Sequence, residues 1–75
     1  MKLSAFIEGL QVLKQHFVGE DGYHIGAEYD QFYVYQTETA LTEAEVAHMR
    51  KLGWFQPELG PDAPYNPQEG WSAFL

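Results

Sequence analysis

The sequence predicts an α+β domain in the order helix, antiparallel β-hairpin, helix and short third strand, with both helices packed on one face of a small antiparallel sheet. Apolar residues recur at helical spacing near the N-terminus and again after Leu41. Between these segments, the stretch YHIGAEYDQFYVYQT is rich in aromatic and β-branched residues, which favour strands. A further aromatic stretch, GWSAFL, closes the chain. The order of these signals predicts the order of the elements.

The first helix is expected at about residues 4–17. The apolar residues of this segment share one helical face: Leu3, Phe6, Ile7, Leu10, Leu13 and Phe17. The opposite face is polar and carries Glu8, Gln11, Lys14 and Gln15. Gly9 weakens such a helix by about 1 kcal/mol relative to Ala, unless close packing requires a glycine there. The apolar face of this helix needs a sheet to cover.

A hairpin is expected after the first helix. Residues 19–22 are two glycines around two acids and form a turn. The strands are expected at about residues 23–28 and 32–37, joined antiparallel over residues 29–31. Because side chains alternate along a strand, one face of the hairpin can meet the helices while the other presents tyrosines.

The second helix has a well-marked start. Thr42 is at the N-cap position and Glu45 follows three residues later, so their side chains can each bind a free backbone N–H group of the first turn. Leu41 before the cap and Val46 inside the helix are spaced to pack on each other as a hydrophobic staple. These four residues predict where the helix begins and the angle at which the chain enters it.

The end of the second helix is equally well marked. Arg50 and Lys51 lie in the last turn, where positive charge complements the helix dipole. Gly53 can adopt the left-handed conformation that ends a helix. Trp54 follows and is placed to fold back on Met49, which predicts that it fixes the second helix to the sheet.

The last third of the chain changes in composition. Residues 56–69 contain all four prolines and are expected to form a long loop without regular structure. Residues 70–75 are again aromatic and are expected to form a short strand beside the hairpin, with Trp71 and Phe74 partly buried. The chain is expected to form a single domain over residues 1–75.

Composition limits the classes of function. The chain has 75 residues, no cysteine and a net charge of −7, so disulfides and thiolate zinc sites are excluded. No apolar run approaches the roughly 18 residues of a membrane span, and we expect a cytoplasmic protein. The negative charge argues against direct binding to nucleic acid, which requires positive charge at the phosphates. A protein partner with a basic surface suits it better.

Three stretches together resemble a known kind of protein. The succession YDQFYVY, LTEAEVAHMRKLGWF and GWSAF is similar to small acidic uncharacterised proteins of bacteriophages and prophages, in which a hairpin precedes a short helix ending in Leu-Gly-Trp and a closing aromatic segment. The resemblance covers residues 29–74. It implies origin and architecture, places the protein in the cytoplasm of a host cell, and brings no catalytic residue with it.

An active site is not evident in the sequence. Ser4 and Ser72 do not lie in a nucleophile motif such as Gly-x-Ser-x-Gly, and no glycine-rich phosphate loop is present. One conceivable metal site lies around the first turn, where four ligand types gather without a standard spacing: His16, Glu20, Asp21 and His24. We therefore expect neither catalysis nor a cofactor, and a small metal-dependent enzyme remains the least favoured alternative.

Binding is expected on the hairpin. Tyrosine and tryptophan are more numerous than one small core can bury, and both are enriched in binding hot spots. The candidate site is an aromatic patch with an acidic rim, made of Tyr29, Tyr33, Tyr35, Glu28, Asp30 and Glu38, with Glu69 as a further rim residue. The sequence therefore predicts a binding module that inhibits or modulates a host or defence protein, such as a nuclease. The alternatives are that the tyrosines only cover the sheet, or that the edge near residues 71–75 pairs with a second copy.

Overall fold

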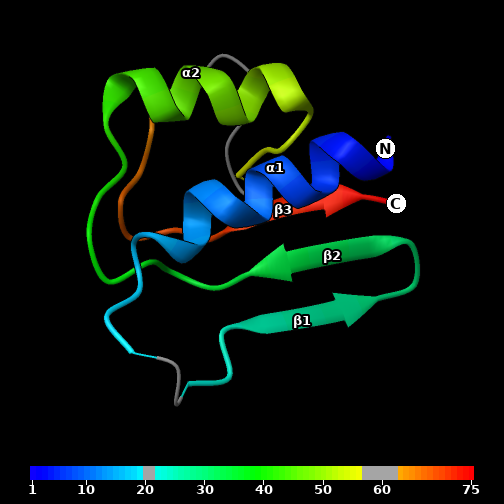
Figure 1. Ribbon diagram of the computed structural model, residues 1–75, viewed down its shortest axis with the longest axis horizontal. Coiled ribbons are helices and arrows are strands. Elements are labelled where there is room, and N and C mark those ends of the chain that lie inside the picture. Colours follow the sequence, from blue (N-terminus) through cyan, green and yellow to red (C-terminus); the bar gives the residue numbers. More distant parts are fainter. Residues whose placement is uncertain (20–21, 57–62) are drawn as a thin grey trace.

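Figure 1 shows the computed structural model, which describes residues 1–19, 22–56 and 63–75. Its elements follow one another as α1 (Leu3–Lys14), β1 (Ile25–Glu28), β2 (Gln31–Val34), α2 (Glu43–Leu52) and β3 (Trp71–Phe74). The predicted α+β class and the predicted order of the elements are confirmed. The expected turn at residues 19–22 lies in part outside the described residues, as do residues 57–62 of the expected proline-rich loop.

The three strands form one antiparallel sheet in the order β1-β2-β3. Val34 at the centre of the sheet pairs with Ile25 on one side and Trp71 on the other, and directly paired residues point to the same face. This face carries the buried side chains of Val34, Trp71 and Ala73, and the helices cover it at β2 and β3. The opposite face carries Tyr33 and, just beyond β2, Tyr35, as the alternation of side chains along the strand predicted.

α1 is shorter than expected, and most of its predicted apolar face meets the core. It ends at Lys14, and the chain then continues through tight turns in which the N–H groups of His16 and Phe17 donate to carbonyls three residues back. Leu3 and Ile7 are exposed, whereas the other four residues of the predicted face belong to the core or pack against it: Phe6, Leu10, Leu13 and Phe17. The buried residues of the helix are Gly9 and Leu13.

Trp54 explains why Gly9 is buried on α1. Its indole ring stacks on Phe6 with centroids 5.7 Å apart and meets the ring of Phe32 edge-on at 6.4 Å. Its Nε1 donates to the carbonyl of Ala5 at 3.3 Å. A Cβ atom at Gly9 would lie 2.1 Å from that nitrogen, so only glycine fits there. The predicted role of Trp54 in fixing α2 to the sheet is confirmed, and the same ring also holds α1.

The capping of α2 follows the expectation in detail. The Thr42 hydroxyl accepts from the Glu45 N–H at 3.2 Å, and the Glu45 carboxylate accepts from the Thr42 N–H at 2.9 Å. Gly53 has a φ of 101° and ends the helix. Leu41 and Val46, the predicted staple pair, are both buried.

The hairpin is tighter than expected. Glu28 pairs with Gln31, which leaves only Tyr29 and Asp30 in the turn instead of the three expected residues. Tyr29 adopts a φ of 56°, a left-handed conformation that tyrosine rarely takes. The strands are correspondingly short: β1 begins two residues later than expected, and β2 ends three residues earlier.

The edge of β3 is partly occupied. Phe55 and Ser72 exchange two backbone hydrogen bonds, at 2.9 and 2.7 Å, on the side of β3 away from β2. The edge at which we expected a second copy to pair is therefore shared with the chain's own residues. Tyr65 completes this side of the core, because its ring stacks on Trp71 and its hydroxyl accepts from the Leu41 N–H at 3.0 Å.

Candidate functional site

Two tyrosines dominate the sheet face that the helices leave open. Tyr33 and Tyr35 alternate with the buried residues of β2 and its extension, and their ring centroids lie 5.6 Å apart. Both rings lie over Gly26 of β1, where a Cβ atom would be 2.3 Å from the Tyr33 ring and 2.8 Å from the Tyr35 hydroxyl oxygen. The absence of a side chain at residue 26 therefore lets the two rings extend across β1. We call Gly26, Tyr33 and Tyr35 the tyrosine face.

A hollow of about 340 Å³ adjoins the tyrosine face. Its floor includes Ser72, which is buried and accepts a hydrogen bond from the Gln31 side-chain amide at 3.1 Å. The charged residues that line it are Glu28 and Glu69, both carboxylates. The hollow is thus aromatic on one side and acidic at its rim, which suits a basic or polar side chain from another molecule.

The structure gathers only part of the predicted site. Glu28, Tyr33 and Tyr35 line the same hollow. Tyr29, at 98% exposure, lies with Asp30 in the hairpin turn, outside the lining of the hollow.

Glu38 lies elsewhere, in contrast to its expected place on the rim. Its backbone N–H donates to the carbonyl of His16 at 3.0 Å, and its carboxylate accepts from the Val18 N–H. The reason is that the chain leaves the sheet after β2 and passes the end of α1 before it reaches α2 (Figure 1).

Gly26 was not singled out in the sequence, although a glycine inside a strand is a signal of close approach by other groups.

Charge is strongly segregated in this molecule. The sequence has no Lys or Arg between Lys14 and Arg50, and none after Lys51. The four cationic side chains therefore belong to the two helices and to the residue before α1, and all three strands lack them. Since the strands and the hairpin turn carry Glu28 and Asp30, the sheet side of the molecule is acidic as well as aromatic.

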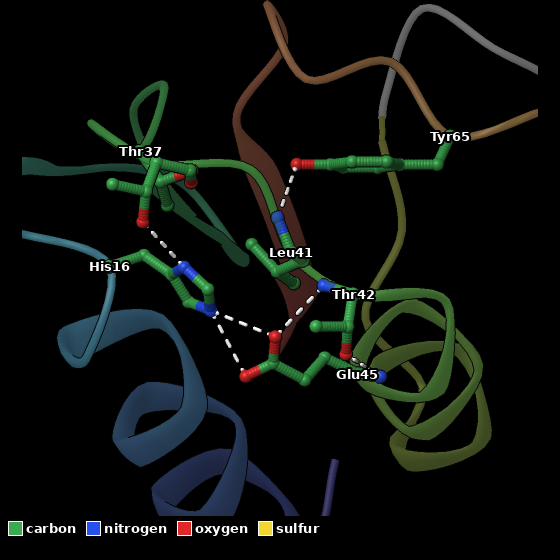
Figure 2. A network of polar contacts seen from close by, with 7 residues as sticks. His16, Thr37, Leu41, Thr42, Glu45 and Tyr65 are labelled. Carbon is green, nitrogen blue, oxygen red and sulfur yellow. Dashed lines mark hydrogen bonds and ion pairs between the residues drawn. The ribbon is translucent and has the colours of Figure 1, made fainter.

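A polar cluster joins the end of α1 to the start of α2 (Figure 2). The His16 ring is hydrogen-bonded through Nδ1 to the Thr39 hydroxyl at 2.7 Å and through Nε2 to both Glu45 carboxylate oxygens at 3.0 Å. The backbone hydrogen bond from Thr42 and the hydrogen bond from His16 lower the pKa of Glu45 below its ordinary value. Glu45 therefore serves as cap and as partner of a histidine 29 residues away.

The Thr39 hydroxyl, the His16 ring and the Glu45 carboxylate follow one another as a nucleophile, a base and an orienting carboxylate do in an active site. Two observations favour a structural role for Thr39, His16 and Glu45. None of them lines the hollow beside the tyrosine face or a second hollow on the helix side of β1. The His16 carbonyl also accepts from two backbone N–H groups of the α2 approach, so both the ring and the carbonyl of this residue join chain segments. Sequence reasoning missed this cluster because no local pattern links residues so far apart.

The conceivable metal site is not assembled by the described residues. Both ring nitrogens of His16 are engaged, and the ring of His24 stacks on Phe17 with centroids 4.2 Å apart. Glu20 and Asp21 lie outside the described residues. Within residues 1–19, 22–56 and 63–75, no group of three or more His, Asp or Glu residues is placed to hold a metal ion.

A second hollow, of about 600 Å³, lies on the helix side of β1. Its lining is mainly apolar: Leu10, Leu13, Phe17, Ile25 and Val34, with Lys14 and His24. It exists because α1 packs on the part of the sheet that holds Phe32, while β1 lies clear of both helices in Figure 1. Ile25 is consequently 59% exposed on the face that is buried elsewhere in the sheet.

Comparisons of the chain with known protein families, curated proteins and solved structures found no match. None of the helices in the described part of the chain is long and apolar enough to span a membrane.

Proposed function

We propose that this chain is a non-catalytic acidic binding module that occupies a basic surface of another protein through its tyrosine face and the adjoining hollow. The observation that carries the proposal is the combination of the tyrosine face, in which Tyr35 is exposed and Tyr33 half-buried, with a sheet that has no Lys or Arg. The partner is a host or defence protein, such as a nuclease or another nucleic-acid-binding protein, met in the host cytoplasm. The phage origin rests on the sequence resemblance.

Physical chemistry supports this partner class. A surface of one charge sign raises the rate at which oppositely charged proteins meet it. Tyrosine rings offer a face to Lys or Arg side chains, which is worth about 0.5–1 kcal/mol at an exposed site and more when water is excluded. Glu28 and Glu69 at the hollow can pair with the same cations. A groove built to bind nucleic acid presents such cations, so an acidic protein can compete for it.

Affinity capture with matched tyrosine variants tests the proposal. The chain is immobilised and exposed to a bacterial lysate at about 0.1 M salt, where the screening length is about 10 Å. Wild type is compared with Tyr33→Ala/Tyr35→Ala and with Tyr23→Ser/Tyr29→Asn, which removes two exposed tyrosines outside the tyrosine face. We expect one basic protein to be retained by wild type and by the second variant and to be lost from the first.

Salt provides the second criterion of the capture experiment. The retained protein should elute at about 1 M salt, where the screening length falls to about 3 Å. Equal retention by all three chains, or retention that salt does not affect, would refute the tyrosine face as the binding surface.

A further inference from the structure

The outer edge of β1 is open. The sheet order places β1 at one margin, and among the described residues no strand pairs with its outer side (Figure 1). The other margin differs, because Phe55 exchanges two hydrogen bonds with Ser72 of β3. An open edge offers unpaired backbone groups to any extended chain that can lie against it.

The hydrogen bonds of the hairpin identify the backbone groups that face outward. The Tyr35 N–H donates to the His24 carbonyl at 2.8 Å, so His24 faces β2. Backbone groups alternate in direction along an antiparallel strand, so Gly26 and Glu28 also face β2. Ile25 and Ala27 therefore direct their N–H and C=O groups to the open edge.

The two sides of this edge differ in chemistry. On the helix side, Ile25 borders the apolar hollow of about 600 Å³, which Leu10 and Phe17 also line. On the other side, the tyrosine rings lie over Gly26, so a side chain placed opposite this glycine on an added strand would meet them. Glu28 follows on that same side. The edge therefore favours apolar residues on one side of an added strand and cations on the other.

We propose that the β1 edge binds an extended segment of the basic partner as a fourth antiparallel strand, with alternating apolar and cationic residues. The segment's apolar residues pair with Ile25 and Ala27 and point toward the hollow. Its Lys or Arg residues lie opposite Gly26 and Glu28 and contact the tyrosine rings. This proposal rests on the proposed function and names the mode of binding, in which main-chain hydrogen bonds give affinity and side chains give selectivity.

Charge selects this occupant over a second copy of the chain. Two copies paired through β1 would place two sheets side by side that both lack Lys and Arg and that both carry Glu28 and Asp30. Like charges brought together in this way repel each other, whereas a segment rich in Lys or Arg complements the same acids. Self-association is therefore a distinct outcome of the test.

The probe is a short peptide of alternating Lys and Val with blocked ends, added to the full chain. Backbone amide exchange is followed by NMR. Binding at the edge should slow exchange of the Ile25 and Ala27 amides about tenfold or more, since tenfold corresponds to about 1.4 kcal/mol of protection. The amides of Gly26 and Glu28, already directed to β2, serve as internal controls and should change little.

Two modified peptides test the predicted orientation. In an antiparallel pair the valines lie opposite Ile25 and Ala27, so valine amides face β1 and lysine amides face away. N-methylation at every valine should abolish the protection. N-methylation at every lysine leaves the required donors in place and should preserve it.

Three results would overturn the proposal. The first is that the alternating peptide does not bind, and the second is that it binds and shifts Tyr33 and Tyr35 signals without protecting Ile25 and Ala27. The third is protection of these two amides in the chain alone that rises with its concentration, which would indicate self-association. The capture experiment with the tyrosine variants decides the proposed function separately. A basic partner that needs Tyr33 and Tyr35 but leaves the Ile25 and Ala27 amides unprotected would uphold the proposed function. The same result would refute the added strand.

Discussion

At the scale of single residues, a few side chains connect segments that are far apart in the sequence. Glu45 closes the N-terminus of α2 and binds His16, whose side chain is only 12% exposed, at the end of α1. Trp54 fills the space that Gly9 leaves on α1. Each of these contacts predicts a measurable effect on stability.

Replacing Glu45 by Gln should lower stability and change its pH dependence. The folded chain lowers the pKa of Glu45 from its ordinary value of 4.5, so the ionised carboxylate stabilises the fold above that pH, and the stabilisation is lost as pH falls through the lower folded value. We expect Glu45→Gln to cost about 1 kcal/mol at pH 7, the usual worth of a capping contact. The difference should shrink in urea unfolding below about pH 4.

Glu43→Gln is the matched control for Glu45→Gln. It removes an exposed acid from the same first turn of α2 without touching His16. An equal loss of stability in both variants would show that general helix-dipole charge, and not the cluster around His16, is responsible.

Replacing Gly9 by Ala should destabilise the protein despite improving helix propensity. Propensity alone would add about 1 kcal/mol. The new methyl group would lie 2.1 Å from the Trp54 Nε1, and overpacking of this kind costs about 1–3 kcal/mol. Urea unfolding and near-ultraviolet circular dichroism of the tryptophans would measure the effect. Gln11→Ala on the exposed side of α1 is the control, and a more stable Gly9→Ala chain would contradict the packing.

At the scale of elements, local signals predicted what local physics determines. The cap at Thr42 and the stop at Gly53 require only neighbouring residues, and both were correctly predicted. The apolar face of α1 was predicted except at Leu3 and Ile7, which are exposed, and the burial of Gly9 could not be predicted because Trp54, which is remote in the sequence, packs there. The open edge at β1 could not be predicted, because it depends on β3 pairing with β2 and not with β1, a contact between segments far apart in the sequence. For the same reason, the chain's path after β2 places Glu38 beside α1, away from the tyrosine face.

The turn between β1 and β2 predicts a stabilising substitution. Tyr29 has a φ of 56°, and the left-handed region costs a residue with a side chain roughly 1–2 kcal/mol. Glycine avoids that strain but loses about 0.5–1 kcal/mol of chain entropy on folding. Tyr29→Gly should therefore raise the unfolding free energy by about 0.5 kcal/mol. Tyr23→Gly, at another exposed tyrosine without a positive φ, should not; a loss at Tyr29 as large as at Tyr23 would refute the strain.

At the scale of the whole molecule, the chain places its cations with the helices and keeps them off the sheet. The sheet side presents Tyr33 and Tyr35 beside Glu28 and Glu69, together with the open edge of β1. The sequence predicted an aromatic and acidic hairpin, and the structure adds which of its residues share one hollow. We propose that this side of the molecule, and not net charge alone, binds the basic partner.

The most direct test is the partner's dissociation constant for two charge-reversal variants with the same net charge. Glu28→Lys reverses a charge at the tyrosine face, and Glu43→Lys reverses one on the exposed start of α2. We predict that Glu28→Lys weakens binding about tenfold or more, because an attraction becomes a repulsion, whereas Glu43→Lys has little effect. Equal weakening by both variants, or no effect of Glu28→Lys, would contradict the claim.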